Sequence, residues 1–322
     1  MRFAPSPEQR DFAGSLRDLL AASDVPAVGR AWARGDFGPG RKLWTRLAEA
    51  GVTALGVPEA LGGVGASPVD LVIGFEELGR AAVPGPYVES VAVLPALLAG
   101  TPSQSRLAAL ASGEALATVA LAPHTPFALD AGAADDVFVV DGSTLRAATV
   151  SRELASVDRA RRLAVLTPGT VIAEGVDAVR AFELGALATA AQILGAGEAL
   201  LDKARTYARQ RVQFGRPIGS FQAVKHQLAD AMVGLELARP LLYGAALALV
   251  DSTATLSRDV SAAKVACTDA AYRASRASLQ VHGAIGYTAE YDLALWLTKV
   301  RALVSAWGTQ PVHRARVLAA LQ

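Results

Sequence analysis

Two short stretches of this sequence carry side chains suited to binding phosphate groups. In the first, Arg211 follows a long helical pattern and precedes the loop "VQFGRPIGSFQ". Its guanidinium can therefore project from a helix end and hold a pyrophosphate with paired hydrogen bonds. Gln222 lies eleven residues later and offers amide donors, and Phe214 offers an apolar ring. Each residue also has an ordinary alternative, namely a solvated arginine, a helix-start cap and a core phenylalanine.

The second stretch is "LQVHGAIGY", in which Gln280 is followed by Gly283 and Gly286. Glycine lets backbone N–H groups approach a phosphate or a ribose closely, because no Cβ stands in the way. The ordinary alternative is a plain turn between two helices. Both stretches are thus compatible with a phosphate-bearing ligand, and neither identifies it alone.

Other common site chemistries find no support in the sequence. His226 and His282 fall inside the two stretches, but we interpret both as structural histidines and expect no metal site. His124 and His313 carry no signal of their own. The chain has no Gly-x-Ser-x-Gly nucleophile motif and no Walker loop.

Composition narrows the class of protein. The chain has 322 residues, 52% of them hydrophobic, with 31 basic and 30 acidic side chains, so we expect no nucleic-acid partner. The single cysteine, Cys267, excludes an internal disulfide framework and favours a reducing cytoplasm. The first residues lack the apolar core of a signal peptide, and Gly and Glu interrupt the longest apolar runs. We therefore expect a cytoplasmic protein without a membrane segment.

The elements that must position these residues fall into three zones. Residues 1–105 show helical periodicity and predict a helical domain, with Gly51 ending one helix and Ser67 capping another. Residues 106–175 contain short β-branched runs between Gly, Pro and Asp, and predict a small domain of about five strands. Residues 176–322 predict four long helices in an antiparallel bundle. The expected fold is mainly α with a small β domain.

With this order of domains, the chain resembles the acyl-CoA dehydrogenases, flavoenzymes that oxidise acyl-CoA thioesters to α,β-unsaturated thioesters. Three motifs in register carry the resemblance: "LWTRLAEAGVTALGVPEALGGVGASPVDLVIGFEELGRA", "RQRVQFGRPIGSFQAVKHQLAD" and "LQVHGAIGYTAEYDLALW". The second is similar to the family's Arg-x-x-Phe-Gly stretch, and the third to its Gln-x-x-Gly-Gly-x-Gly-Tyr stretch.

The resemblance implies FAD as cofactor and assigns it a set of residues. In the family, the two stretches serve an FAD that is held mainly by the neighbouring subunit. Carried over by position, the FAD-binding residues are Arg211, Phe214, Gln222, Gln280, Gly283 and Ala284. Ala284 stands where the family usually has a second Gly, so this stretch is slightly altered.

The same resemblance shows that the catalytic base is missing. Most members have a Glu immediately before a Gly-Thr pair, and that position is Trp307, whose indole offers no useful acceptor. A minority keep the Glu on the first bundle helix, at the position of Gly185. Glu183 is close in sequence, but two residues are about 200° around a helix, so it faces away. We expect no catalytic residue in this chain, and expect Trp307 to fill the volume of a thioester.

The motifs that hold a flavin ring are also absent. The family's Thr-Glu-Pro…Gly-Ser-Asp loop and Trp-Ile-Thr-Asn-Gly strand are replaced by "HTPFALDAGAADDVFVVDG". A chain that keeps one half-site and loses the other resembles the shorter subunit of heteromeric α2β2 acyl-CoA dehydrogenases that act on steroid side chains. Its expected partner is a homologous subunit that carries the catalytic Glu.

Two alternatives remain open. The chain could be an active homo-oligomeric acyl-CoA dehydrogenase with an unusual base, for which Glu183 and Glu198 are candidates. It could also be a scaffold subunit that no longer binds flavin. The acyl group that the enzyme acts on is not encoded in any motif of this chain.

Overall fold

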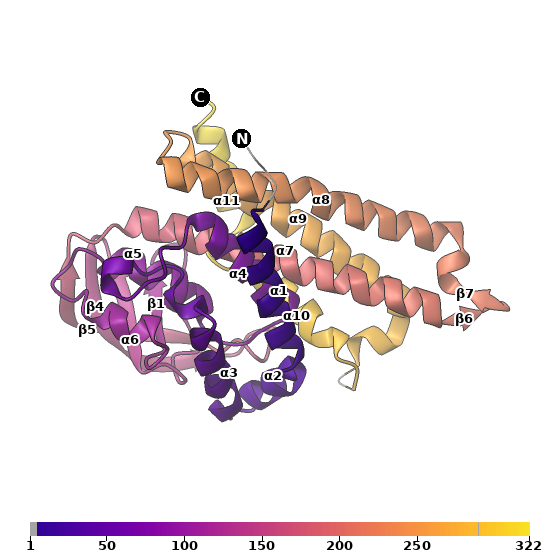
Figure 1. The fold of residues 1–322 in the computed structure, drawn as a ribbon, viewed down its shortest axis with the longest axis horizontal. Helices are drawn as coiled ribbons and strands as arrows, with labels where there is room; N and C mark the ends of the chain where they lie inside the picture. Colours follow the sequence, from indigo (N-terminus) through magenta and orange to yellow (C-terminus); the bar gives the residue numbers. More distant parts are fainter. Residues whose placement is uncertain (1–4, 289) are drawn as a thin grey trace.

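The computed structural model of the chain describes residues 5–288 and 290–322; Ala289, within the third motif, lies outside the described residues. Figure 1 shows the strands of the larger sheet at one end of the molecule with the N-terminal helices beside them, and the short hairpin of β6 and β7 at the opposite end. The long helices α7, α8 and α9 run side by side from there to the opposite end. The mainly helical fold with a small sheet is as predicted.

The N-terminal part is helical up to Ala111. Ser67 caps α4 as predicted, because its hydroxyl accepts a hydrogen bond from the Asp70 N–H. Gly51 follows α3 with a φ of +81°, which favours glycine after a helix. The elements are α1 (Pro7–Ala21), α2 (Val25–Ala33), α3 (Gly38–Glu49), η1 (Val52–Ala54), η2 (Glu59–Leu61), α4 (Pro68–Arg80), the π-helical η3 (Val88–Val93), α5 (Leu94–Leu98) and α6 (Arg106–Ala111).

The small β region is a five-stranded sheet, the number of strands predicted, in the order β1-β3-β4-β5-β2. Only β1 and β3 pair in parallel; the other neighbours are antiparallel. The strands are β1 (Ala117–Leu121), β2 (Ala128–Leu129), β3 (Asp136–Asp141), β4 (Thr144–Leu154) and β5 (Leu163–Glu174).

The individual strands differ from prediction in two respects. The runs "RLAVLTP" and "TVIAEG", expected as two strands, form the single strand β5, and the short β2 was not expected. β2 covers only Leu163 and Ala164, so the rest of β5 has a free edge, where Pro168 is tolerated. A register shift between Arg146 and Ala148 of β4 accommodates this segment.

The C-terminal part contains one helix more than expected. Its elements are α7 (Ala178–Gln210), β6 (Val212–Gln213), β7 (Arg216–Pro217), η4 (Ile218–Ser220), α8 (Gln222–Asp251), α9 (Leu256–His282), η5 (Gly283–Tyr287), α10 (Leu293–Leu303) and α11 (Gln310–Ala319). The run "DLALWLTKVRALVSAW" is expected as the fourth helix and ends at Trp307, but α10 ends at Leu303. The turn that holds Trp307 then leads into α11, so the four-helix prediction missed α11.

Helix α7 is the centre of the molecule because its small residues allow close contact. A Cβ on Gly195 would lie 1.9 Å from the Glu76 carbonyl oxygen, and a Cβ on Gly79 would lie 1.9 Å from the Gln192 carbonyl oxygen. Backbones of α4 and α7 therefore touch only because both positions are glycine. This contact fixes the N-terminal helices against the bundle.

Within residues 5–288 and 290–322, two helices, α7 and α8, are long and apolar enough to cross a membrane. In α7, 94% of the most apolar window is buried inside the protein, and in α8 the share is 44%. The length and apolarity of α7 are therefore those of a core helix.

Candidate functional site

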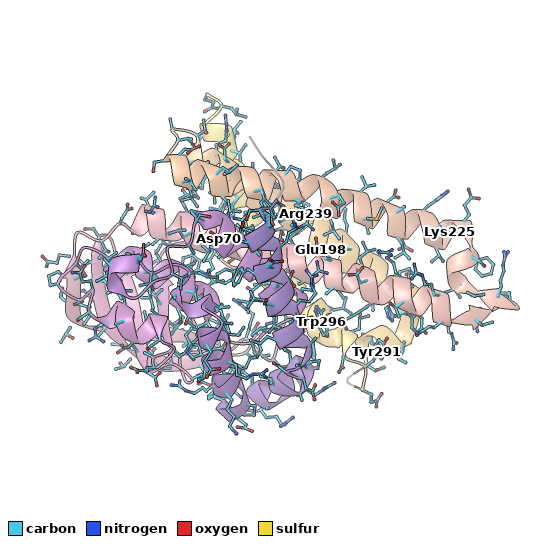
Figure 2. All side chains as sticks on the ribbon, viewed as in Figure 1. Asp70, Glu198, Lys225, Arg239, Tyr291 and Trp296 are labelled. Atoms are coloured by element: carbon cyan, nitrogen blue, oxygen red, sulfur yellow. The ribbon has the colours of Figure 1, made fainter. Side chains whose placement is uncertain are left out.

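The helix ends that carry the predicted phosphate-binding residues lie together. Val281 of α9 packs with Ala204 and Ala208 of α7, and Val224 and Leu228 of α8 pack against this cluster. The C-terminus of α7, the N-terminus of α8 and the C-terminus of α9 therefore meet at one end of the bundle. Figure 2 shows Lys225 of α8 at this end, away from Glu198 and Arg239 in the middle of the molecule.

Arg211 and Phe214 lie at the tip of this end. Arg211 follows α7 directly with an extended backbone, and its side chain is exposed. The hairpin of β6 and β7 turns at Phe214 and Gly215, whose φ angles are +52° and +77°. Phe214 is 92% exposed, so the alternative of a core phenylalanine is wrong. An apolar ring presented to solvent at a hairpin tip is suited to covering a ligand or a partner.

The remaining predicted residues of this set are exposed as well. Gln222 is the first residue of α8, and α8 has no side-chain cap, so the capping alternative is wrong. Gln280 lies in the last turn of α9 and is exposed. Gly283 ends α9 with a φ of +67°, no atom lies within 4 Å of the place of its Cβ, and Ala284 beside it is exposed. This backbone corner is open to a ligand, as the prediction requires.

The two histidines of these stretches have different roles. His282 is buried, its Nδ1 lies 2.8 Å from the Ser278 carbonyl oxygen, and its ring stacks on Tyr207. Burial lowers the pKa of His282, so it is a structural histidine as predicted. His226 is exposed and lies 3.4 Å from the Gln222 amide nitrogen. The structural prediction is wrong for His226, because its side chain lies on the exposed face of α8.

Trp307 and Gly185 lie away from this end of the bundle, near the sheet, and they are in direct contact with each other. A Cβ on Gly185 would lie 2.3 Å from Cε3 of Trp307. The indole, 2% exposed, fills the space that any side chain at position 185 would need. The two positions at which the family was expected to carry its base therefore converge in space, and an indole occupies the volume between them.

Trp307 is held against a buried carboxyl group that the sequence did not point out. Its Nε1–H donates to Oε1 of Glu89 at 3.0 Å, and Glu89 belongs to the π-helical η3. Burial raises the pKa of Glu89, and Arg161 opposes this shift. The sequence did contain a signal for Glu89, because it is an acidic residue inside the apolar run "YVESVAV". Acidic side chains are rarely buried in a core unless they are paired, so a carboxylate in such a run indicates a specific role.

The turn that presents Trp307 is anchored by buried side chains of α9 and α11. His313 Nε2 lies 2.9 Å from the Trp307 carbonyl oxygen, and its Nδ1 lies 3.2 Å from Ser261 Oγ. Burial lowers the pKa of His313 to about 4, so the neutral ring donates from Nε2 to the carbonyl. Lys264 Nζ donates to the Leu303 carbonyl oxygen at 2.9 Å. These bonds hold Trp307 at a φ of +54°, an uncommon conformation for a bulky residue.

A cavity of about 650 Å³ adjoins Trp307 and Glu89. Its other walls come from residues 123–129, which run from the end of β1 into β2, from residues 156–163, which lead into β5, and from residues 301–309, which span the end of α10 and the turn after it. This is the junction at which the sheet, the bundle and η3 meet. Within it, Glu89 is the one carboxylic side chain among the described lining residues.

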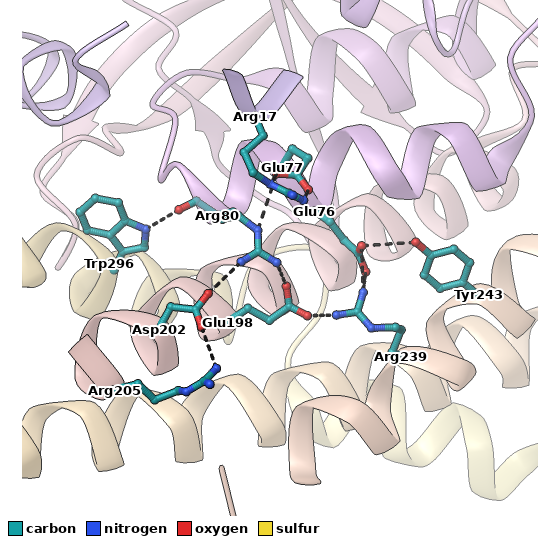
Figure 3. Close-up of polar contacts among 10 residues, drawn as sticks. All are labelled: Arg17, Glu76, Glu77, Arg80, Glu198, Asp202, Arg205, Arg239, Tyr243 and Trp296. Atoms are coloured by element: carbon teal, nitrogen blue, oxygen red, sulfur yellow. Dashed lines mark hydrogen bonds and ion pairs between the residues drawn. The ribbon is translucent and has the colours of Figure 1, made fainter. Parts of the chain in front are cut away.

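Glu183 and Glu198, the candidate substitute bases, are both engaged by arginines. Glu183 pairs with Arg316 of α11, and Glu198 pairs with Arg80 and Arg239. Figure 3 shows Glu198 inside a network of ion pairs that joins α1, α4, α7 and α8. Each of these carboxylates is thus engaged by at least one arginine, and neither residue lines the cavity beside Trp307. The geometry does not favour either as a base.

Known proteins match this chain over nearly its whole length. Residues 6–114 match the acyl-CoA dehydrogenase N-terminal domain, and residues 175–322 match the C-terminal domain. Acyl-CoA dehydrogenase IpdE2 of Mycobacterium tuberculosis is 34% identical over 299 residues, which cover 92% of this chain and 91% of that protein.

Two solved structures share the fold. The ChsE4-ChsE5 complex from Mycobacterium tuberculosis matches with a TM-score of 0.85 and 24% identity, over 100% of this chain and 99% of that chain. A steroid ACAD, Tcur3481-Tcur3483, matches with a TM-score of 0.83 and 22% identity, over 98% of this chain and 97% of that chain. With both domains matched in order and a relative of 34% identity, the chain belongs to the acyl-CoA dehydrogenase family.

Proposed function

We propose that this chain is a subunit of a heteromeric FAD-dependent acyl-CoA dehydrogenase, in which it completes the FAD site of a homologous partner and supplies no catalytic base. One observation carries the proposal. The exposed donors at the bundle end are retained, whereas the indole of Trp307 fills the place of the base. The similarity to ChsE4-ChsE5, a complex of two named chains, supports a heteromeric assembly.

The bundle end fits part of an FAD. Arg211, Gln222 and Gln280 are exposed donors, and Gly283 leaves its backbone corner open. In the proposed assembly they hold the pyrophosphate and neighbouring groups, and Phe214 packs against the cofactor or its subunit. Bound FAD supplies the hydride acceptor for oxidation of the acyl-CoA. The role of this chain is to bind and orient that cofactor.

The partner has to supply the general base. Removing the α-proton of a thioester needs a carboxylate within hydrogen-bond reach of that proton. Trp307 is a hydrogen-bond donor only, and Gly185 has no side chain. The proposed assembly is therefore an α2β2 heterotetramer in the cytoplasm, with the catalytic Glu on the homologous partner. The similarity to a steroid ACAD favours a steroid side-chain CoA as substrate.

Purification of the chain alone and together with a homologous subunit encoded next to it tests the proposal. The lone chain should bind no stoichiometric FAD and oxidise no acyl-CoA, whereas the pair should do both. Stoichiometric FAD and turnover of acyl-CoA by the lone chain would disprove the proposal.

A second candidate is an active homo-oligomer with an unusual base, and the observation that favours it is Glu89. This carboxyl lines the cavity beside Trp307, and burial raises its pKa, as is common for acid–base residues. If Glu89 is a base, the lone chain should oxidise acyl-CoA and Glu89→Gln should abolish this activity. An inactive lone chain would exclude this candidate.

A further inference from the structure

A groove between α8 and α9 lies next to the proposed FAD half-site. The two helices run side by side (Figure 1), and the groove between them has a volume of about 530 Å³. Ala231 of α8 and Ala277 of α9 line it, and these small, buried side chains leave its space open. Arg276, also in its wall, lies one turn before Gln280 on the same face of α9. The groove therefore adjoins the surface at which the partner's FAD is proposed to bind.

The walls of this groove are rich in hydrogen-bond donors. Arg273 and Arg276 are exposed, and neither guanidinium makes a hydrogen bond or an ion pair within the part of the chain that the structure describes. The Tyr272 hydroxyl and the Gln227 amide are further donors in the walls. Asp230 is the one acidic side chain among the described lining residues. Because a planar guanidinium pairs bidentately with a carboxylate, the groove is suited to acidic groups.

The proposed FAD site does not use these two arginines. The chain has 31 basic and 30 acidic residues, so a pair of arginines without acidic partners is a local excess of charge. Arg273 and Arg276 lie one turn apart on α9, where like charges repel each other. Val233 and Leu237 follow Asp230 on the same face of α8 and are exposed apolar side chains. An apolar stripe beside a charged groove indicates a protein partner that supplies the counter-charge.

A second copy of this chain is poorly suited to this surface. Two identical chains that meet through the same groove are related by a two-fold axis, so the arginine pair of one faces the arginine pair of the other. Like charges that face each other across an interface oppose association. A homologous but different subunit is free to present carboxylates at the same place.

We propose that the groove between α8 and α9 receives acidic side chains of the homologous partner subunit, and that these ion pairs select that partner. The partner's carboxylates pair with Arg273 and Arg276 and accept a hydrogen bond from the Tyr272 hydroxyl. Apolar side chains of the partner lie against Val233 and Leu237. The inference rests on the proposed function, because the occupant is the subunit that holds the FAD.

Dilution of the flavin-loaded assembly tests this interface, with excess FAD present so that loss of cofactor does not drive dissociation. Mass photometry measures the Kd between this chain and its partner in NaCl at about 50 mM and about 500 mM. The Kd should rise at least about tenfold at the higher salt, because salt screens exposed charge pairs. An equal Kd at both concentrations would overturn this inference alone. Absence of any assembly at either concentration would disprove the proposed function as well.

Paired substitutions locate the charges. Arg273→Gln with Arg276→Gln should raise the Kd about tenfold at low salt and remove most of its salt dependence, and the same positions changed to Glu should raise it about a hundredfold. The matched control is Arg34→Glu with Lys42→Glu, which changes the net charge equally at exposed residues outside the groove and should alter the Kd less than about threefold.

Thermal unfolding of each double variant verifies the fold. A wild-type Kd in the folded Glu variant would contradict the assignment of Arg273 and Arg276. Self-association of the lone chain that these substitutions abolish would also contradict it, because the occupant would then be a second copy.

Discussion

The bundle end and the Trp307 cavity differ in how their polar groups are satisfied. At the bundle end, Arg211 and Gln280 are exposed and make no side-chain hydrogen bond within the described residues. At the cavity, Trp307 bonds to Glu89, and His313 bonds to Trp307 and to Ser261. Groups that are left open are available to an external ligand, whereas groups bonded internally fix a structure. This difference supports the proposal that the chain contributes hydrogen-bond donors to an FAD that is held mainly by another subunit.

The largest expected effect on stability comes from the interior region. Trp307→Ala should lower the free energy of unfolding by about 3–5 kcal/mol, because it removes a buried indole and leaves Oε1 of Glu89 without its donor. Phe214→Ala is the matched control, and it should change stability by less than about 0.5 kcal/mol because this ring is exposed. Denaturant unfolding measures both. Similar losses of unfolding free energy in the two variants would contradict the distinction between the buried region and the exposed one.

A smaller effect, on cofactor binding, should come from the bundle end. Arg211→Ala should weaken FAD binding to the complete assembly by about 1.5–3 kcal/mol, the usual worth of a hydrogen bond to a charged group. The control is Arg209→Ala, which removes an exposed arginine two residues earlier on α7. Flavin fluorescence titration measures the affinity. Unchanged flavin content in Arg211→Ala would favour the flavin-free scaffold instead.

The contact between positions 185 and 307 can be tested separately. Gly185→Ala should destabilise the chain by about 1–3 kcal/mol, because the new methyl group collides with the indole. Alanine otherwise stabilises a helix interior relative to glycine, so a net loss isolates the clash. In a Trp307→Leu background the loss should largely disappear, as a double-mutant cycle would show. An equal loss in both backgrounds would mean that the two positions do not compete for space.

The last expected effect is confined to acidic pH and arises at the anchor of Trp307. His313 has a pKa of about 4 in the folded chain against 6.5 without burial, so the unfolded chain binds more protons between these values. Its contribution to stability is complete above pH 6.5 and is lost as the pH falls towards 4. His313→Gln should flatten the stability curve in this window. His226→Gln, at an exposed ring, should keep the wild-type slope.

Local signals were enough for much of the fold. The predicted start of the C-terminal helical zone, residue 176, lies within two residues of the start of α7, and the start of α4 was recognised from its Ser67 cap. The cofactor residues came from motifs that lie at helix ends, where short-range sequence determines exposure. Their positions at one end of the bundle agree with this interpretation, and their role in FAD binding stays a prediction.

The remaining features depend on contacts that no local pattern reports. Trp307 and Glu89 are 218 positions apart, so their hydrogen bond cannot be read from either segment. Helix α11 was missed because its one buried residue is the polar His313, which gives no apolar stripe. Pro168 and Gly169 indicated a break in β5, but the strand continues because its outer edge is largely free.

The most direct test of the central claim is the structure of the flavin-loaded assembly with the homologous partner. The account predicts one FAD for each pair of chains, with its pyrophosphate at Arg211, Gln222 and Gln280 and its ring in the partner subunit. A flavin ring seated in the cavity beside Trp307, with a carboxylate of this chain at the α-carbon of the thioester, would contradict it.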